Sequence, residues 1–112
     1  PAAGFPSLYR IALPALAEAR HRSADEEACR VQALMALIVG VDDTNLLYRG
    51  GAEGLTFAQT RARTFLDAGG IGAVDWRVDA IAAHRDFTAR RLSPGGCADL
   101  LAMALFVETA TI

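Results

Sequence analysis

Apolar residues recur at helical spacing along almost the whole chain. Between residues 7 and 22 they fall three and four positions apart, which predicts a first helix with Ser7 as its N-cap. Pro14 lies inside this stretch, and it is expected to kink or divide the helix because proline has no N–H to donate. The apolar face consists of Leu8, Ile11, Ala12, Ala15, Leu16 and Ala19.

A second helix is predicted to begin at Ser23. Ser23 and Glu26 have the spacing of a capping box. In this motif the side chain of each residue accepts a hydrogen bond from the backbone N–H group of the other, at the start of the helix. The stretch 31–41 that follows is strongly apolar. We expect this helix to deliver Asp42 and Asp43 at or near its C-terminal end.

Two further helices are predicted in the middle of the chain. The stretch 49–54 contains three glycines and is typical of a turn or loop. Thr56 and Gln59 form another capping-box pattern, which predicts a helix that ends at residues 69–70. Asp75 is then placed to cap the next helix.

The last predicted helix has Ser93 as its N-cap and Pro94 just inside its first turn. No segment shows the alternation of apolar and polar residues that strands require. The pattern therefore predicts an all-α fold, a compact bundle of five to six helices that forms a single domain over residues 1–112.

Composition adds an expectation about what surrounds this domain. Hydrophobic residues make up 53% of 112, which is rich for a soluble chain of this length, so apolar surface is expected to be covered by a partner, by a second copy or by more of the same protein. Because the chain begins with Pro1, we interpret it as a fragment of a larger all-helical protein.

Charge and targeting signals exclude several classes of protein. The net charge of −2 argues against a nucleic-acid binder. No apolar run is long enough to span a bilayer and no targeting signal is present, so a cytoplasmic location without membrane contact is expected. The two cysteines have neither zinc-site spacing nor a disulfide framework.

The first of two polar insets is V-D-D-T-N-L-L-Y-R-G-G, residues 41–51. On a helix Asp42, Asn45 and Arg49 would share one face, whereas Asp43 would join them only if the helix ends there. Carboxylate and amide oxygens suit Mg²⁺, and an arginine beside them is a candidate clamp for a phosphate. The alternative interpretation is a capped turn, with the arginine in a salt bridge.

The second inset is L-S-P-G-G-C-A-D-L-L, residues 92–101. Its glycines leave backbone N–H groups free at the positive end of a helix dipole, which is a suitable place for an anion. An ordinary capped helix start is equally consistent with the pattern. Asp99, one turn further on, has three open roles: pairing with an arginine, binding a metal, or complementing the dipole. Cys97 at the helix start is expected to have a lowered thiol pKa.

Taken together and in order, these motifs resemble the C-terminal part of the triphosphoribosyl-dephospho-CoA synthases. The resemblance covers essentially the whole chain. The arginine-rich context of the second inset is more similar to the malonate decarboxylase branch of that family than to the citrate lyase branch. The matching segments are F-P-S-L-Y-R-I-A-L-P-A-L at 5–16, D-D-T-N-L-L-Y-R-G-G at 42–51, E-G-L-T-F at 53–57, F-L-D-A-G-G at 65–70 and L-S-P-G-G-C-A-D-L-L-A at 92–102.

The resemblance implies a transferase that joins ATP to 3'-dephospho-CoA and releases adenine. The product, 2'-(5''-triphosphoribosyl)-3'-dephospho-CoA, would be the precursor of the prosthetic group of a malonate decarboxylase acyl-carrier protein. The resemblance implies Mg²⁺ as the cofactor, with Asp42, Asp43 and Asn45 as its ligands. It implies catalytic roles for Asp42 and Asp43, and substrate or phosphate contacts for Asn45, Arg49, Ser93, Gly95, Gly96 and Asp99.

The chain departs from the family pattern at two positions, with Tyr48 where histidine is usual and Cys97 where serine is usual. The N-terminal portion of the family, which carries the other half of the active site, is missing, so we expect this piece to be inactive alone. It would then act with that half or as a homodimer. Two rival functions remain: a helical binding or dimerisation module without catalysis, and a metal-dependent nucleotide hydrolase.

Overall fold

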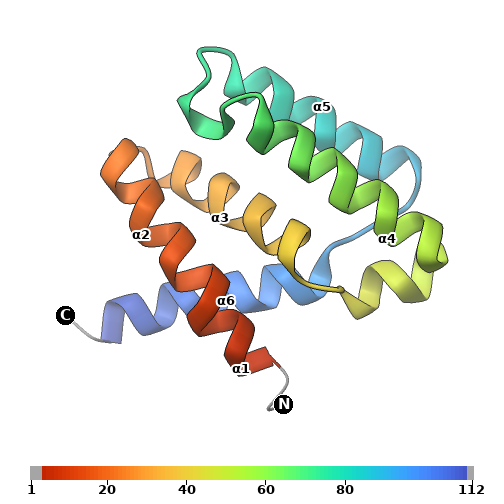
Figure 1. Ribbon diagram of the computed structural model, residues 1–112, viewed down its shortest axis with the longest axis horizontal. Helices are drawn as coiled ribbons and strands as arrows, with labels where there is room; N and C mark the ends of the chain where they lie inside the picture. The colour runs from red at the N-terminus through yellow and green to blue at the C-terminus, as the bar shows by residue number, and fades with distance from the viewer. Residues whose placement is uncertain (1–3, 111–112) are drawn as a thin grey trace.

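The computed structural model describes residues 4–110 and confirms the all-α prediction, since no strand occurs within that range. The predicted bundle of helices is present (Figure 1). The elements are α1 (Gly4–Ser7), the π-helix η1 (Leu8–Ala12), α2 (Leu13–Arg22), α3 (Glu26–Gly40), α4 (Thr44–Asp67), the 3₁₀ turn η2 (Gly70–Gly72), α5 (Trp76–Ala89) and α6 (Gly95–Ala110).

Helix α3 lies at the centre and the other helices pack around it. Figure 1 shows α2 on one side of α3, the pair α4 and α5 on the other, and α6 crossing behind α2. The molecule is flat, with extents of 39 × 38 × 18 Å. Because α3 has neighbours on several sides, it is buried on more than one face, at Ala28, Cys29, Ala33, Met35, Leu37 and Ile38.

The first helical segment is continuous from α1 to α2, with a change of helical type just before Pro14. The five residues of η1 form a π-helix, and Pro14 is the second residue of α2. Proline has no N–H to donate to the preceding turn. The change from π-helical to α-helical hydrogen bonding therefore lies where Pro14 was predicted to kink or divide the helix. The predicted cap was wrong: Ser7 has helical backbone angles and its side chain makes no capping hydrogen bond.

Helix α3 is capped by Asp25 rather than by Ser23. The Asp25 carboxylate accepts from the backbone N–H groups of Glu27 and Ala28. The Ser23 hydroxyl accepts from the Asp25 N–H instead, at 3.0 Å. A carboxylate is the stronger acceptor at the positive end of the helix dipole, so the predicted capping box was wrong by two residues.

The stretch 49–54, predicted to be a turn or loop, interrupts α4 at a single residue. Gly51 has non-helical backbone angles, φ 65° and ψ −164°, and forms a kink between two helical halves, so the prediction is confirmed at Gly51 while the residues on either side are helical. Gly50 and Gly54 serve close packing instead, because a Cβ on Gly50 would lie 2.6 Å from Leu92 Cδ2. Tertiary packing, and not turn formation, therefore accounts for two of these three glycines.

The start predicted at Thr56 was wrong, because the helical half of α4 that follows the kink at Gly51 already includes this residue. The side chain of Gln59 does not cap a helix; its amide donates to the carbonyl of Val41 and to Asp42 Oδ1, each at 3.2 Å. The predicted end of this helix is confirmed, since Gly69 follows α4 with a left-handed φ of 115°. Asp75 occupies the N-cap position of α5, but its side chain makes no capping bond.

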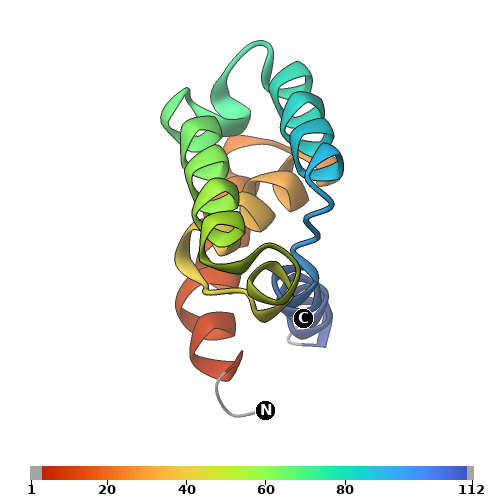
Figure 2. The same cartoon turned by 90° about the vertical axis from the view of Figure 1, so that its right-hand side faces the viewer.

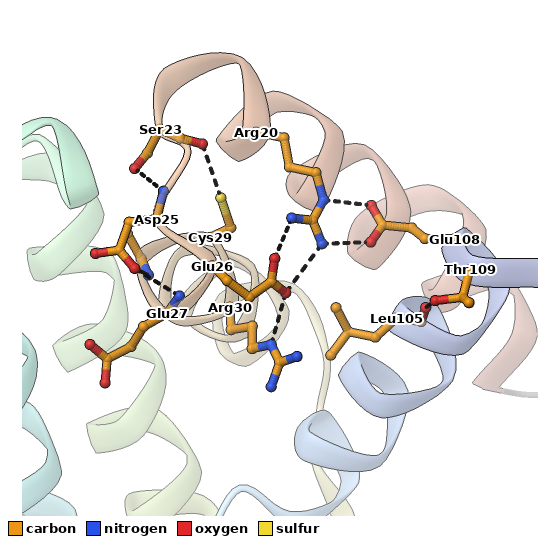
Figure 3. Close-up of polar contacts among 11 residues, drawn as sticks. Arg20, Ser23, Asp25, Glu26, Glu27, Cys29, Arg30, Leu105, Glu108 and Thr109 are labelled. Carbon is orange, nitrogen blue, oxygen red and sulfur yellow. Dashed lines mark hydrogen bonds and ion pairs between the residues drawn. The ribbon is translucent and has the colours of Figure 1, made fainter. Parts of the chain in front are cut away.

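A cluster of ion pairs attaches the C-terminal part of α6 to α2 and α3 (Figure 3). Arg20 of α2 contacts Glu26 at 2.6 Å and Glu108 at 2.7 Å. Arg30 also contacts Glu26, at 2.9 Å. Hydrogen bonds from Arg20 and then from Arg30 lower the pKa of Glu26 to about 2. Arg20 and Arg30 therefore serve the fold through these ion pairs.

Candidate functional site

The two polar insets meet where α4 and α6 begin. Asp43 connects them, because its Oδ2 accepts from the backbone N–H of Cys97 at 2.9 Å, across 54 positions of sequence. Its Oδ1 accepts from the N–H groups of Asn45 at 2.8 Å and Leu46 at 3.4 Å. Figure 2 shows the connection from α5 descending to the start of α6 beside the first turns of α4. One carboxylate thus caps two helices.

Asp43 is buried, with only 1% of its surface exposed. Three backbone donors satisfy its oxygens, and the positive ends of two helix dipoles face its charge. A carboxylate placed in this way stabilises the fold. Both oxygens accept from backbone N–H groups, and the predicted roles of Asp43 as a magnesium ligand and a catalytic group stay predictions.

Asp42 lies outside both helices, so the predicted helix face shared by Asp42, Asn45 and Arg49 was wrong. Helix α3 ends at Gly40 and α4 begins at Thr44, which leaves Asp42 in the connection between them. Asp42 is exposed and its carboxylate contacts Gln59, whereas the neighbouring carboxylate is directed to the start of α6. Within residues 4–110 no three His, Cys, Asp or Glu side chains are grouped to hold a metal ion.

Asn45 and Arg49 do share a face, one turn apart on α4, and both are exposed. Asp99 is exposed on α6. The alternative interpretation of Arg49, as a partner in a salt bridge, is not realised among the described residues. This arginine is therefore available to a ligand.

The start of α6 differs from its prediction in two ways. The helix begins at Gly95, and the carbonyl of Pro94 accepts from the N–H of Ala98 at 2.9 Å, so Pro94 precedes the helix and Ser93 is not its N-cap. The backbone N–H of Cys97 was predicted to be one of the groups free to bind an external anion. It donates instead to the carboxylate of Asp43. Part of the predicted anion site is thus filled by the protein's own anion.

Cys97 does not have the lowered pKa that its place in the helix predicted. Its side chain is fully buried, and burial raises the pKa of the thiol above its ordinary value; the nearby charge of Asp43 raises it further. The prediction of a lowered pKa was wrong because the thiol is enclosed and does not face solvent at the helix start.

The two glycines of the second inset differ in what surrounds them. A Cβ on Gly96 would lie 3.1 Å from Asp43 Oδ1, and that carboxylate is held by three hydrogen bonds. A Cβ on Gly95 would instead overlap the amide end of Asn45, an exposed side chain that is able to rotate away.

We therefore expect Gly96→Ala to be less stable than Gly95→Ala by about 1–3 kcal/mol, since overpacking against a fixed group is costly. Each variant gains the same helix propensity, so Gly95→Ala is the matched control. Urea denaturation followed by circular dichroism measures the difference. Equal stability of the two variants would show that the Asp43 carboxylate is not fixed.

A cavity of about 660 Å³ opens beside this junction, between α3 and α5. Arg49 and Ser93, one residue from each inset, lie on its wall. Its floor is apolar, and its polar lining includes the exposed basic residues Arg49, His84 and Arg91. The lining consists of Val31, Leu34, Met35, Ile38, Arg49, Ala80, His84, Phe87, Thr88, Arg91, Leu92, Ser93 and Pro94.

Arg91 adopts an unusual backbone conformation at the end of α5. Its φ is 57°, the one positive value outside glycine in the described part of the chain. The N–H of Leu92 bonds to the carbonyl of Phe87, and the N–H of Arg91 to that of Thr88, which is the Schellman pattern of helix ends. Glycine is the usual residue at this position, so sequence reasoning, which relied on glycine as the signal, missed both the motif and Arg91.

The comparison with protein families decides the relationship. The profile of the ATP:dephospho-CoA triphosphoribosyl transferase family, CitG, matches residues 2–111. The chain belongs to this family. The resemblance seen in the motifs of the two insets is thereby confirmed.

Curated relatives agree with this assignment. A protein of Stutzerimonas stutzeri (strain A1501) is 41% identical over 108 residues, which cover 96% of this chain and 37% of the relative. One of Acinetobacter calcoaceticus is 37% identical over 106 residues, covering 95% of this chain and 36% of the relative. Both are named "Probable 2-(5''-triphosphoribosyl)-3'-dephosphocoenzyme-A synthase". The chain thus spans somewhat more than a third of their length. No solved structure matches it.

Within this CitG-family chain, the two departures from the usual pattern lie in different surroundings. Tyr48 is 90% exposed on α4, so its side chain is open to contact with another molecule. Cys97 is enclosed beside the buried carboxylate. The departure at Tyr48 changes an exposed surface, whereas the departure at Cys97 changes the packing where α4 and α6 begin.

Proposed function

We propose that this chain supplies one part of the active site of a triphosphoribosyl transferase that joins ATP to 3'-dephospho-CoA and releases adenine. The observation that carries the proposal is the junction itself: Asp43 holds the two insets together by its bond to Cys97, 54 positions away, beside a cavity lined by Arg49 and Ser93. Family membership and the printed names of the relatives support the choice of reaction.

The reaction exchanges one bond at a ribose carbon for another. A ribose hydroxyl oxygen of dephospho-CoA attacks the anomeric carbon of the ATP ribose, while the bond from that carbon to adenine breaks and adenine leaves with the electron pair. The hydroxyl loses its proton and adenine takes one up. Positive charge develops at the ribose, and the triphosphate must be held by cationic groups throughout.

The residues around the junction are assigned to these tasks by their exposure. Arg49 contacts the phosphates, because it is exposed, lines the cavity and has no ion pair among the described residues. Asn45, one turn earlier on α4, contacts substrate. Ser93 lines the same cavity as Arg49. Asp42 is the exposed carboxylate of the first inset and takes the acid or base role, whereas Asp43 is buried between the two helix starts.

Magnesium enters this proposal as an ion brought by ATP on its triphosphate. Mg²⁺ is usually bound through one or two carboxylates together with substrate phosphates, so a dedicated cage of three protein ligands is not required. Asp42 and Asn45 are the exposed oxygen donors of the first inset. No step of the reaction is assigned to the ion.

We propose that the remaining active-site groups come from a longer chain or from a second copy, since this chain spans 37% of the first relative. Exposed apolar side chains on α6, Met103 at 42% and Phe106 at 74%, provide surface for such contacts. From Leu100 to Val107 every residue of this helix is apolar, which is typical of a helix with neighbours on more than one side. We further propose that the product serves a malonate decarboxylase acyl-carrier protein in the cytoplasm.

Adenine release tests the proposed function. The intact gene product is incubated with ATP, dephospho-CoA and Mg²⁺, and free adenine is measured by liquid chromatography. We expect adenine only when both substrates are present, and its loss when the ion is chelated. ADP or phosphate release would indicate a hydrolase. No turnover and no ATP binding would favour a binding or dimerisation module.

A further inference from the structure

We propose that the cavity between α3 and α5 binds an adenosine 5'-polyphosphate, with the base against its apolar floor and the phosphates at Arg49 and Arg91. This inference rests on the proposed function and extends it, because it assigns a ligand to a cavity that includes residues outside both insets. ATP and dephospho-CoA share this chemistry, since each carries adenine, ribose and at least two linked phosphates.

The cavity has the size and lining of a nucleotide site. Its volume of about 660 Å³ falls within the range typical of small-molecule pockets. The floor is formed by side chains of α3 and α5 that are buried or half-buried, a surface suited to a planar base. These side chains are Val31, Leu34, Met35, Ile38 and Phe87.

The charge of the cavity complements phosphate. Its lining includes the two arginines Arg49 and Arg91, while no acidic side chain lines it among the described residues, although the chain as a whole has a net charge of −2. Arginine suits this task because its planar fork donates two parallel hydrogen bonds to phosphate oxygens.

Among the described residues, Arg49 and Arg91 are not used by the ion pairs of the fold, a property they share with Arg10, Arg63, Arg85 and Arg90, and they are distinguished from those four because both line the cavity. Neither Arg49 nor Arg91 has a carboxylate partner within the described range 4–110. The arginines that do pair with a carboxylate are Arg20, Arg22, Arg30, Arg61 and Arg77. Two cations without a protein partner thus converge on one cavity.

The backbone at Arg91 adds an independent observation. This residue occupies the left-handed position of a helix end, where glycine is free of the steric cost that an arginine bears. Its neighbours Phe87 and Leu92, which the motif brings together, are themselves part of the cavity wall. An arginine at this position is explained if its side chain is needed in the cavity.

Calorimetric titration of the intact gene product with ATP and, separately, with dephospho-CoA tests the inference. We expect Arg91→Gly to weaken binding of at least one nucleotide tenfold or more without lowering Tm, because glycine suits the left-handed backbone. Ala80→Phe, which fills the cavity from α5, is expected to have the same effect on affinity. Arg85→Gln is the matched control, since Arg85 is exposed on the same helix and does not line the cavity.

The two titrations show which nucleotide occupies the cavity, and adenosine and inorganic triphosphate as further probes separate the base from the phosphates. Wild-type affinity for both nucleotides in Arg91→Gly and in a folded Ala80→Phe would overturn the inference, as would the absence of binding. Adenine release with unchanged KM in those variants would overturn the inference alone. Binding that depends on the cavity, without adenine release under any condition, would overturn the proposed function alone.

Discussion

Replacing Asp43 by alanine is expected to lower the free energy of unfolding by about 2–4 kcal/mol. The change removes the N-cap of α4, which contributes about 1 kcal/mol. It also leaves the buried N–H of Cys97 without its acceptor, at a cost of about 1–3 kcal/mol. Urea denaturation of the chain, followed by circular dichroism, measures the loss.

Asp42→Ala is the matched control for this prediction. Asp42 is the adjacent carboxylate, but it is exposed and accepts one hydrogen bond from Gln59, so its removal is expected to change stability by no more than about 0.5 kcal/mol. If both variants lost the same stability, Asp43 would not be the residue that joins the two insets.

The second large effect is expected on activity. Arg49→Gln in the intact gene product is predicted to lower kcat/KM for ATP by about 10–100-fold, because it removes a charged hydrogen bond to phosphate of about 1.5–3 kcal/mol. The helix should tolerate the change, since Arg49 is exposed and glutamine is a good helix former. The initial rate of adenine release, measured over a range of ATP concentrations, gives the ratio.

Arg85→Gln serves again as the control, with an expected kcat/KM close to that of the wild type. It removes an exposed arginine of α5 that has no place in the cavity wall. An unchanged ratio in Arg49→Gln would remove this arginine from the set of phosphate contacts. A loss of equal size in both variants would indicate a general effect of net charge.

Much of the architecture followed from local sequence, because apolar spacing and strong helix breakers act within a few residues. The all-α class and the end of α4 at Gly69 are of this kind. The stretch 49–54 was predicted only in part, since Gly51 forms a kink as a turn residue would, whereas Gly50 and Gly54 make room for Leu92 in a distant segment. Packing between remote segments overrides local preference there.

The candidate site shows the same division between local and distant effects. Both insets were recognised from residue type, but the roles of Asp42 and Asp43 depend on a contact with Cys97 that no local pattern reveals. Arg91 was missed because the helix end that it forms lacks the usual glycine. Sequence thus indicated which segments matter, while the three-dimensional contacts determined which side chains remain free for a ligand.

A crystal structure of the intact gene product with ATP bound is the most direct test of the central claim that the junction of α4 and α6 handles the triphosphate. We expect phosphate oxygens within hydrogen-bonding distance of Arg49, with Asp43 still buried between the two helix starts. Phosphates bound entirely outside this junction, with Arg49 in contact with solvent alone, would contradict it.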